Sequence, residues 1–183
     1  MQKQATAAYQ NLSSQLTASV GTSSDSLLKN IGTDLGARVT KLGESLTTND
    51  AAKAQLTTAM ESLLGKNDAQ AVSGLGKITD LKLSSEQTTL AKDVYNAAAA
   101  LVTQRNFSSL EGMNTEVTSV VNSVWKGNYT QALPALQKIY GQANLTEPQK
   151  NLLGTTFDKY APGWRDNAVK VQQGLDTLKK FGK

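Results

Sequence analysis

Cysteine and histidine are both absent from this chain of 183 residues. Without cysteine there is no disulfide, no thiolate metal ligand and no thiol nucleophile. Without histidine the chain lacks the side chain that most often acts as a general base and most often binds transition metals. We therefore expect neither a metal site nor a cofactor, and any catalysis would have to rely on serine, lysine, tyrosine or carboxylates.

Proline and aromatic side chains are scarce: the chain has three prolines, two tryptophans, five tyrosines and three phenylalanines. Few prolines mean few forced helix breaks, and the straight-chain residues that are plentiful here lose little side-chain freedom in a helix. A hydrophobic content of 39% with 19% charged residues is normal for a folded domain and argues against disorder. The composition favours helices around a hydrophobic core.

Long hydrophobic runs are missing as well. None approaches the about 20 residues that a transmembrane helix needs, and residues 1–5 lack the apolar core of a signal peptide. The chain is rich in serine, threonine, asparagine, glutamine and alanine and poor in arginine, which favours an exported protein. We expect a periplasmic or extracellular location, with the signal peptide removed; a cytoplasmic location is the alternative.

No motif of reactive residues compensates for these absences. The 15 acidic residues are too sparsely spaced for a calcium-binding loop. Ser26 and Lys29 have a serine–lysine spacing that arises by chance in a chain rich in both. Gly74 and Gly76 lack the preceding strand and the further glycines of a phosphate-binding loop. We expect a protein that is not an enzyme.

Apolar residues recur every three or four positions along the whole chain, and the alternation typical of strands is absent. This pattern predicts an all-α fold of about eight helices, arranged as a helical bundle or a short α-solenoid. Polar side chains that can cap helices mark the expected helix starts. These are Ser23 or Ser24, Thr48 or Asn49, Ser84 or Ser85, and Thr146 ahead of Pro148.

Gly32 and Gly36 lie about one turn apart in the second expected helix. In a membrane such a pair favours helix dimerisation, but the neighbouring Asp34 and Arg38 indicate an aqueous setting. We expect the two glycines to let another helix of the same chain approach closely.

An internal repeat of about 61 residues organises the chain. Residues 67–78 align without gaps on residues 128–139, and six of the twelve positions are identical. After one inserted residue, residues 83–87 align on residues 145–149, so the match passes through two turns together with their capping residues. We interpret the alignment as a duplication of a helical unit.

The duplication divides one expected domain, residues 1–183, into three parts. An N-terminal pair of helices covers residues 1–47, and the first repeat unit covers residues 48–108. The second unit, with a basic C-terminal helix, covers residues 109–183.

Residues 125–139 resemble the turn between the two helices of a tetratricopeptide repeat. Gly127 and Tyr129 match the glycine and the aromatic residue of that turn, and Ala132 and Leu136 match the small and apolar residues that open its second helix. The resemblance implies helical hairpins that stack on one another. Two features depart from the family: its period is about 34 residues, and Asp68 occupies the aromatic position in the first copy.

Aromatic residues gather between residues 125 and 164, whereas residues 1–94 contain only Tyr9. One interpretation is a bulkier core in the second unit. The other is a partner-binding surface, because tryptophan and tyrosine are preferred anchors at protein interfaces. The candidates for that surface are Trp125, Tyr129, Tyr160 and Trp164. We expect Trp164, which follows Pro162 and Gly163, to be the most exposed of them.

Basic residues concentrate at the C-terminal end. From Lys159 onward there are six basic residues against two acidic ones. The simpler explanation is that cations complement the dipole at the C-terminus of a helix. The alternative is an anionic partner bound by Arg165, Lys170, Lys179 and Lys180. The presence of only three arginines disfavours nucleic acid, and a membrane contact would be peripheral only.

These patterns predict a non-catalytic, helical-repeat module that binds a protein or has a structural role. Repeated helical units bury their apolar faces by stacking, which leaves a broad outer surface for a protein partner. A homo-oligomer is a further alternative. Attachment to an anionic surface through the basic C-terminal helix is the second functional hypothesis.

Overall fold

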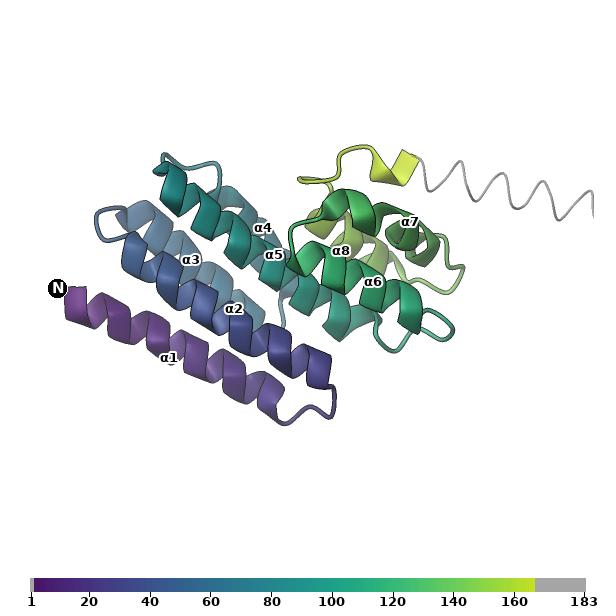
Figure 1. The fold of residues 1–183 in the computed structure, drawn as a ribbon, viewed down its shortest axis with the longest axis horizontal. Helices are drawn as coiled ribbons and strands as arrows, with labels where there is room; N and C mark the ends of the chain where they lie inside the picture. Colours follow the sequence, from purple (N-terminus) through teal and green to yellow (C-terminus); the bar gives the residue numbers. More distant parts are fainter. Residues whose placement is uncertain (1, 167–183) are drawn as a thin grey trace, which may run out of the picture.

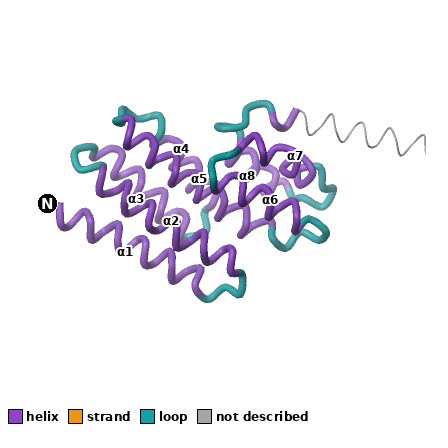
Figure 2. The backbone as a smooth tube through the Cα atoms, in the orientation of Figure 1, coloured by secondary structure: helices purple, strands orange, loops and turns teal. Residues whose placement is uncertain are grey.

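The computed structural model of the chain describes residues 2–166. Over that range the backbone forms α-helices joined by turns and loops, without any strand (Figure 2). In chain order the helices are α1 (Gln2–Gly21), α2 (Ser26–Ser45), α3 (Asp50–Leu64), α4 (Asp68–Ile78), α5 (Ser85–Phe107), α6 (Asn114–Trp125), α7 (Tyr129–Tyr140) and α8 (Glu147–Phe157). The predicted all-α fold is confirmed.

The long helix α5 joins two groups of helices (Figure 1). The first group comprises α1 to α4, with α1 packed on α2, α3 on α4, and α2 on α5. The second comprises α6 to α8, with α6 packed between α5 and α7. Helix α8 lies against both α4 and α5, so it connects the second group to the first.

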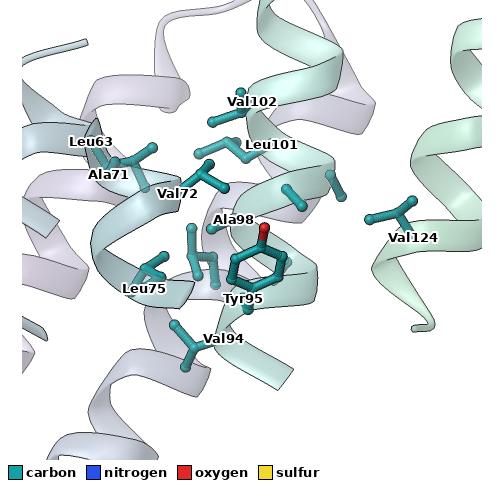
Figure 3. Close-up of a cluster of buried hydrophobic side chains, with 14 of the residues drawn as sticks. Leu63, Ala71, Val72, Leu75, Val94, Tyr95, Ala98, Leu101, Val102 and Val124 are labelled. Carbon is teal, nitrogen blue, oxygen red and sulfur yellow. The ribbon is translucent and has the colours of Figure 1, made fainter. Parts of the chain in front are cut away.

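Helix α5 is buried on every side along residues 97–104. Apolar residues that recur every three or four positions would by themselves bury only one face of this helix. The other alanines of this stretch are buried as well, because their small methyl groups let several helices approach α5 at once. Figure 3 shows side chains of α4 and α5 meeting in this core.

Glycines allow α1 to lie close to α2. A Cβ atom at Gly32 would overlap Val20, one at Gly36 would overlap Ser13, and one at Gly43 would overlap Tyr9. The predicted close approach at Gly32 and Gly36 is therefore confirmed, and the structure identifies the partner as α1.

Side-chain caps fix the starts of four of the eight helices in residues 2–166. Ser84 and Thr146 each form a reciprocal capping box, with Gln87 and Gln149 respectively. Asn49 caps α3. The prediction for α2 was wrong: its cap is Asp25, whose carboxylate accepts a hydrogen bond from the Leu28 amide at 3.0 Å.

The turn before α4 and the turn before α7 have the same backbone geometry. Lys66 and Gly127, which are equivalent in the alignment, both have positive φ angles, of 62° and 77°. The next residues, Asn67 and Asn128, have φ/ψ of −88°/65° and −91°/66°. The backbone amides of Asn67 and Asn128 donate to the backbone carbonyls of Ser62 and Ser123, in both cases at 2.8 Å. This local geometry agrees with the predicted repeat, whereas the boundaries of the units and the tetratricopeptide resemblance stay predictions.

Within the described range, no helix has both the length and the apolar character needed to cross a membrane. Residues 167–183 lie outside that range, and with them the positions of Lys170, Lys179 and Lys180.

Candidate functional site

Aromatic rings from three parts of the chain meet beside α7. Tyr129 at the start of α7 stacks on Tyr160, with ring centres 5.2 Å apart and planes 26° apart. Tyr95 of α5 meets Tyr160 edge to face at 4.8 Å. Phe157 of α8 lies 6.4 Å from Tyr129. Such offset and edge-to-face pairs stabilise a packed cluster beyond the area that they bury.

The tyrosine hydroxyls of this cluster are bonded within the protein. Tyr95 donates to the Thr156 carbonyl and Tyr129 donates to Asn96 Oδ1, both at 2.8 Å. Burial raises the pKa of both Tyr95 and Tyr129, and the neighbouring tyrosines add to the effect. Both groups therefore stay neutral at physiological pH and hold the site together rather than transfer protons.

Trp164 is in the core, so its predicted exposure was wrong. Only 1% of its surface is exposed, and it packs edge to face against Tyr140 and Phe157. Its indole nitrogen donates to Asp158 Oδ1 at 2.9 Å. Gly163, with a φ of 76°, turns the chain back so that the indole points inward.

Trp125 is partly buried and lies apart from the other candidates. Its indole nitrogen donates to Asp34 Oδ2 at 2.7 Å, and Arg38 pairs with the same carboxylate at 2.7 Å. Arg38 also donates to the Asp93 carbonyl at 2.8 Å. Trp125 therefore ties the end of α6 to α2, across the two helix groups.

Of the four aromatic candidates, the structure brings Tyr129 and Tyr160 together at an opening. A hollow of about 460 Å³ lies beside their stacked rings. Tyr129 is mostly buried, with 8% of its surface exposed, and Tyr160 is partly buried. We call this opening the tyrosine hollow; its lining residues are Gly127, Asn128, Tyr129, Thr130, Gln131 and Tyr160.

A second depression continues along the same helix. This α6–α7 groove, of about 240 Å³, is lined by Thr115, Glu116, Ser119, Gln131, Pro134, Ala135 and Lys138. Gln131 lines both openings. The tyrosine hollow and the α6–α7 groove thus adjoin at Gln131, and we call the two openings together the track; its far end is an ion pair between Lys138 and Glu116 (3.3 Å).

The turn at the head of the track is held from two sides. Trp125 before it is bonded to Asp34, and Tyr129 after it is bonded to Asn96. Between them, Gly127 approaches Asn96 so closely that a Cβ atom would lie 2.9 Å from the amide nitrogen. These contacts fix the backbone of the tyrosine hollow.

Of the four basic residues proposed to bind an anionic partner, Arg165 lies within residues 2–166. Its guanidinium pairs with the Asp158 carboxylate and lies 5.9 Å from the Trp164 ring centre. Nearby, Lys159 donates to Asp80 at 2.6 Å and to the Gly76 carbonyl at 2.8 Å. Both cations are thus engaged in contacts of the fold.

Residues 2–166 contain no cluster of three or more acidic side chains that could hold a metal ion. Comparison of the chain with protein-family models, curated proteins and solved structures finds no match.

Sequence reasoning found the two tyrosines of the site but missed its polar half. Asn128, Thr130 and Gln131 are exposed, as is Pro134 further along α7. A usable signal was present, because Asn128 and Thr130 flank Tyr129 and Gln131 follows, so polar residues surround this tyrosine in the sequence. Serine, threonine and glutamine are so common in this chain that polarity alone did not single them out.

Proposed function

We propose that this protein is a non-catalytic binding module that holds a protein partner along the exposed face of α7. The observation that carries the proposal is that two openings, the tyrosine hollow and the α6–α7 groove, adjoin at the exposed Gln131. An elongated, open track suits a polypeptide segment, whereas small substrates are usually enclosed on most sides. Tyrosine rings at one end provide the type of anchor that dominates protein interfaces.

The chemistry of the track supports binding rather than catalysis. In the tyrosine hollow the ionisable groups are the phenols of Tyr129 and Tyr160, and the Tyr129 hydroxyl is occupied by Asn96. In the groove, Glu116 and Lys138 are paired with each other. Ser119 also lines the groove, but its hydroxyl makes no hydrogen bond to Glu116 or Lys138, whereas an activated nucleophile is bonded to its base.

An exported location belongs to the same proposal. It is supported by the composition of the chain, which is rich in small polar residues and contains no cysteine. A periplasmic or extracellular partner would then be the natural ligand of the track.

Attachment to an anionic surface is the second candidate, favoured by the excess of basic residues from Lys159 onward. It ranks below partner binding because Lys159 and Arg165 already pair with Asp80 and Asp158. If it holds, the chain binds anionic vesicles at low salt, and 0.5 M salt or deletion of residues 165–183 releases it; that salt level is roughly enough to cut the screening length to half its physiological value.

Site-specific photo-crosslinking tests the main proposal. A photoreactive amino acid is placed at Gln131 in one variant and at Gln70 in another. Gln70 is the equivalent position in the first repeat and is exposed like Gln131. Each variant is irradiated in an extract of the source cells or culture fluid, the crosslinked protein is identified, and its binding is then measured with purified components.

We expect one protein to crosslink from Gln131 and not from Gln70, and to bind the purified chain saturably. Equal labelling from both positions, or a purified candidate that fails to bind, would contradict the proposal.

A further inference from the structure

We infer that the chain continues beyond residue 166 as an amphipathic helix, whose apolar side packs on a face of α7 formed by Leu133, Gln137 and Tyr140. We call these three residues the α7 face. None of them lines the tyrosine hollow or the α6–α7 groove, so the contact is separate from the partner binding proposed above. Three observations carry the inference: the helix neighbours of α7, the path of the chain at Trp164 and the residue pattern that follows it.

The equivalent helices α4 and α7 differ in their neighbours. Helix α4 packs against α3, α5 and α8, whereas α7 packs mainly against α6 (Figure 1). On α4, Val72 and Gly76 are buried, and Lys159, just after α8, donates to the Gly76 carbonyl at 2.8 Å. The aligned residues of α7, Leu133 and Gln137, are only partly buried. The side of α4 that meets α8 thus has a counterpart on α7 that lacks a second helix in the described part of the chain.

The chain itself leads onto this side of α7. A helical turn begins at Trp164, and its indole packs edge to face on Tyr140, with ring centres 5.1 Å apart. The next residue, Arg165, is turned away from α7 and pairs with Asp158. A helix that continues from Trp164 therefore starts in contact with the C-terminal end of α7.

The sequence after Trp164 keeps apolar residues on the side of that indole. The positions 4, 7, 11 and 14 residues further on share one side of a helix, and they hold Ala168, Val171, Leu175 and Leu178. The opposite side holds Lys170, Gln173 and Lys180, with Val169 as its apolar exception. A short helix of this kind gains most of its stability by packing its apolar side on another element.

The spacing of the two surfaces matches. Leu133 precedes Tyr140 by seven residues, and Val171 follows Trp164 by seven. Two antiparallel helices with the same rise of about 1.5 Å per residue bring Val171 opposite Leu133 when Trp164 meets Tyr140. Because the segment is tethered at Trp164, its effective concentration at α7 is high, which favours it over a second copy of the chain.

Disulfide trapping tests the inference, and the absence of native cysteine leaves no competing thiol. The full chain carrying Leu133→Cys and Val171→Cys is oxidised with copper phenanthroline, and the crosslink is identified by mass spectrometry. A disulfide forms readily only where the two Cα atoms lie within about 7 Å.

Two matched controls each move one thiol. Leu133→Cys with Gln173→Cys places it on the opposite side of the inferred helix, and Gln131→Cys with Val171→Cys places it on the groove side of α7. We expect intramolecular crosslinking at least tenfold faster in the Leu133–Val171 variant than in either control.

A pair of valine substitutions gives an independent measurement. Val171→Asp puts a charge on the apolar side of the inferred helix, and Val169→Asp puts the same charge on the other side. Burying an unpaired carboxylate is costly, so Val171→Asp should lower the thermal midpoint by about 4 °C or more and speed amide exchange in residues 133–140. Val169→Asp should leave both unchanged.

Several outcomes would overturn the inference. Equal crosslinking rates in the three cysteine variants would show that the segment has no fixed place on α7. Crosslinks between copies, recognised in a mixture of nitrogen-14 and nitrogen-15 chains, would assign the α7 face to a second copy instead. Equal effects of Val171→Asp and Val169→Asp would show that the apolar side is not covered. None of these results decides whether a partner crosslinks from Gln131, so the proposed function stands or fails separately.

Discussion

The turn before α4 and the turn before α7 share a backbone but differ in what their side chains do. In the first turn Asp68 occupies the position that Tyr129 occupies in the second. The carboxylate of Asp68 pairs with Arg105 and accepts a hydrogen bond from Asn106 at 2.7 Å. It is bound on several sides within the fold, whereas Tyr129 lines an open hollow.

The helix pairs that these turns connect also differ in how tightly they pack. Between α3 and α4, the amide of Gln55 donates to the Gly74 carbonyl at 3.3 Å, and Gly74 leaves no room for a Cβ atom to be added freely. Between α6 and α7 the equivalent residues are Glu116 and Ala135, and a groove of about 240 Å³ remains open. Internal contacts thus fill the space between α3 and α4 at this point, whereas a groove remains open between α6 and α7. Helix α4 borders a separate opening of about 250 Å³ on the side that faces Tyr95 and Lys159.

The largest expected effect comes from the aromatic cluster around Trp164, where the first copy has no tryptophan. Trp164→Ala should lower the free energy of unfolding by about 4 kcal/mol, because it removes a fully buried indole and leaves a cavity. Urea unfolding followed by circular dichroism measures the change. A loss below about 1 kcal/mol would mean that Trp164 is exposed in solution, and would restore it as a partner-binding candidate.

The next largest effect is expected from breaking the ion pair of the turn before α4. Asp68→Ala leaves the Arg105 guanidinium, which is mostly buried, without its partner and should destabilise the chain by about 3 kcal/mol. Replacing both residues, Asp68→Ala with Arg105→Met, should recover part of that loss. Glu61→Ala, at an exposed position of α3, serves as the control. Equal stability of Asp68→Ala and the control would show that the ion pair is not formed.

Smaller effects are expected at Lys66 and Gly127, the residues with positive φ in the two turns. Gly127→Ala should cost about 1–2 kcal/mol, because a side chain at this φ is strained and would also approach Asn96. Lys66→Gly should stabilise the chain by up to about 1 kcal/mol, because it relieves the same strain in the first copy. Thermal unfolding of both variants checks these opposite signs. Shifts of the same sign would show that the two turns do not share their backbone geometry.

The smallest effect is a pH dependence specific to the second turn. Tyrosine ionises near pH 10 in an unfolded chain, and burial raises the pKa of Tyr129 in the folded protein. Its contribution to stability is therefore complete below about pH 10 and declines as the pH rises above it, by up to about 1.4 kcal/mol per pH unit. Tyr129→Phe should flatten the stability curve between about pH 10 and 11. Unfolding midpoints across that range, compared with Tyr140→Phe, measure the difference; curves parallel to wild type would contradict the burial.

The sequence was sufficient for features that depend on neighbouring residues. Apolar spacing predicted the helices, and Thr146 ahead of Pro148 predicted the start of α8. Features that depend on contacts between residues far apart in the chain could not be predicted from the sequence. Asp25 prevails over Ser23 and Ser24 as the cap of α2, and its second carboxylate oxygen is bonded by Gln104 of α5 at 2.7 Å.

The candidate site shows the same division. The local alignment drew attention to Tyr129, but whether a ring is exposed depends on the chain that folds over it. Trp164 is covered because Asp158 and Tyr140 are brought to it by the fold. Ala135 lines the groove at the position equivalent to Gly74, and a difference of a single methyl group gives no distinctive pattern in a sequence.

Hydrogen exchange on the complex with the partner identified by crosslinking tests the central claim most directly. Amide exchange is measured by mass spectrometry for residues 127–138 and for the equivalent residues 66–77, with and without the partner. We predict slower exchange in residues 127–138 on binding and no change in residues 66–77. Protection of both segments, or of neither, would contradict the claim that one copy of the repeat carries the binding track.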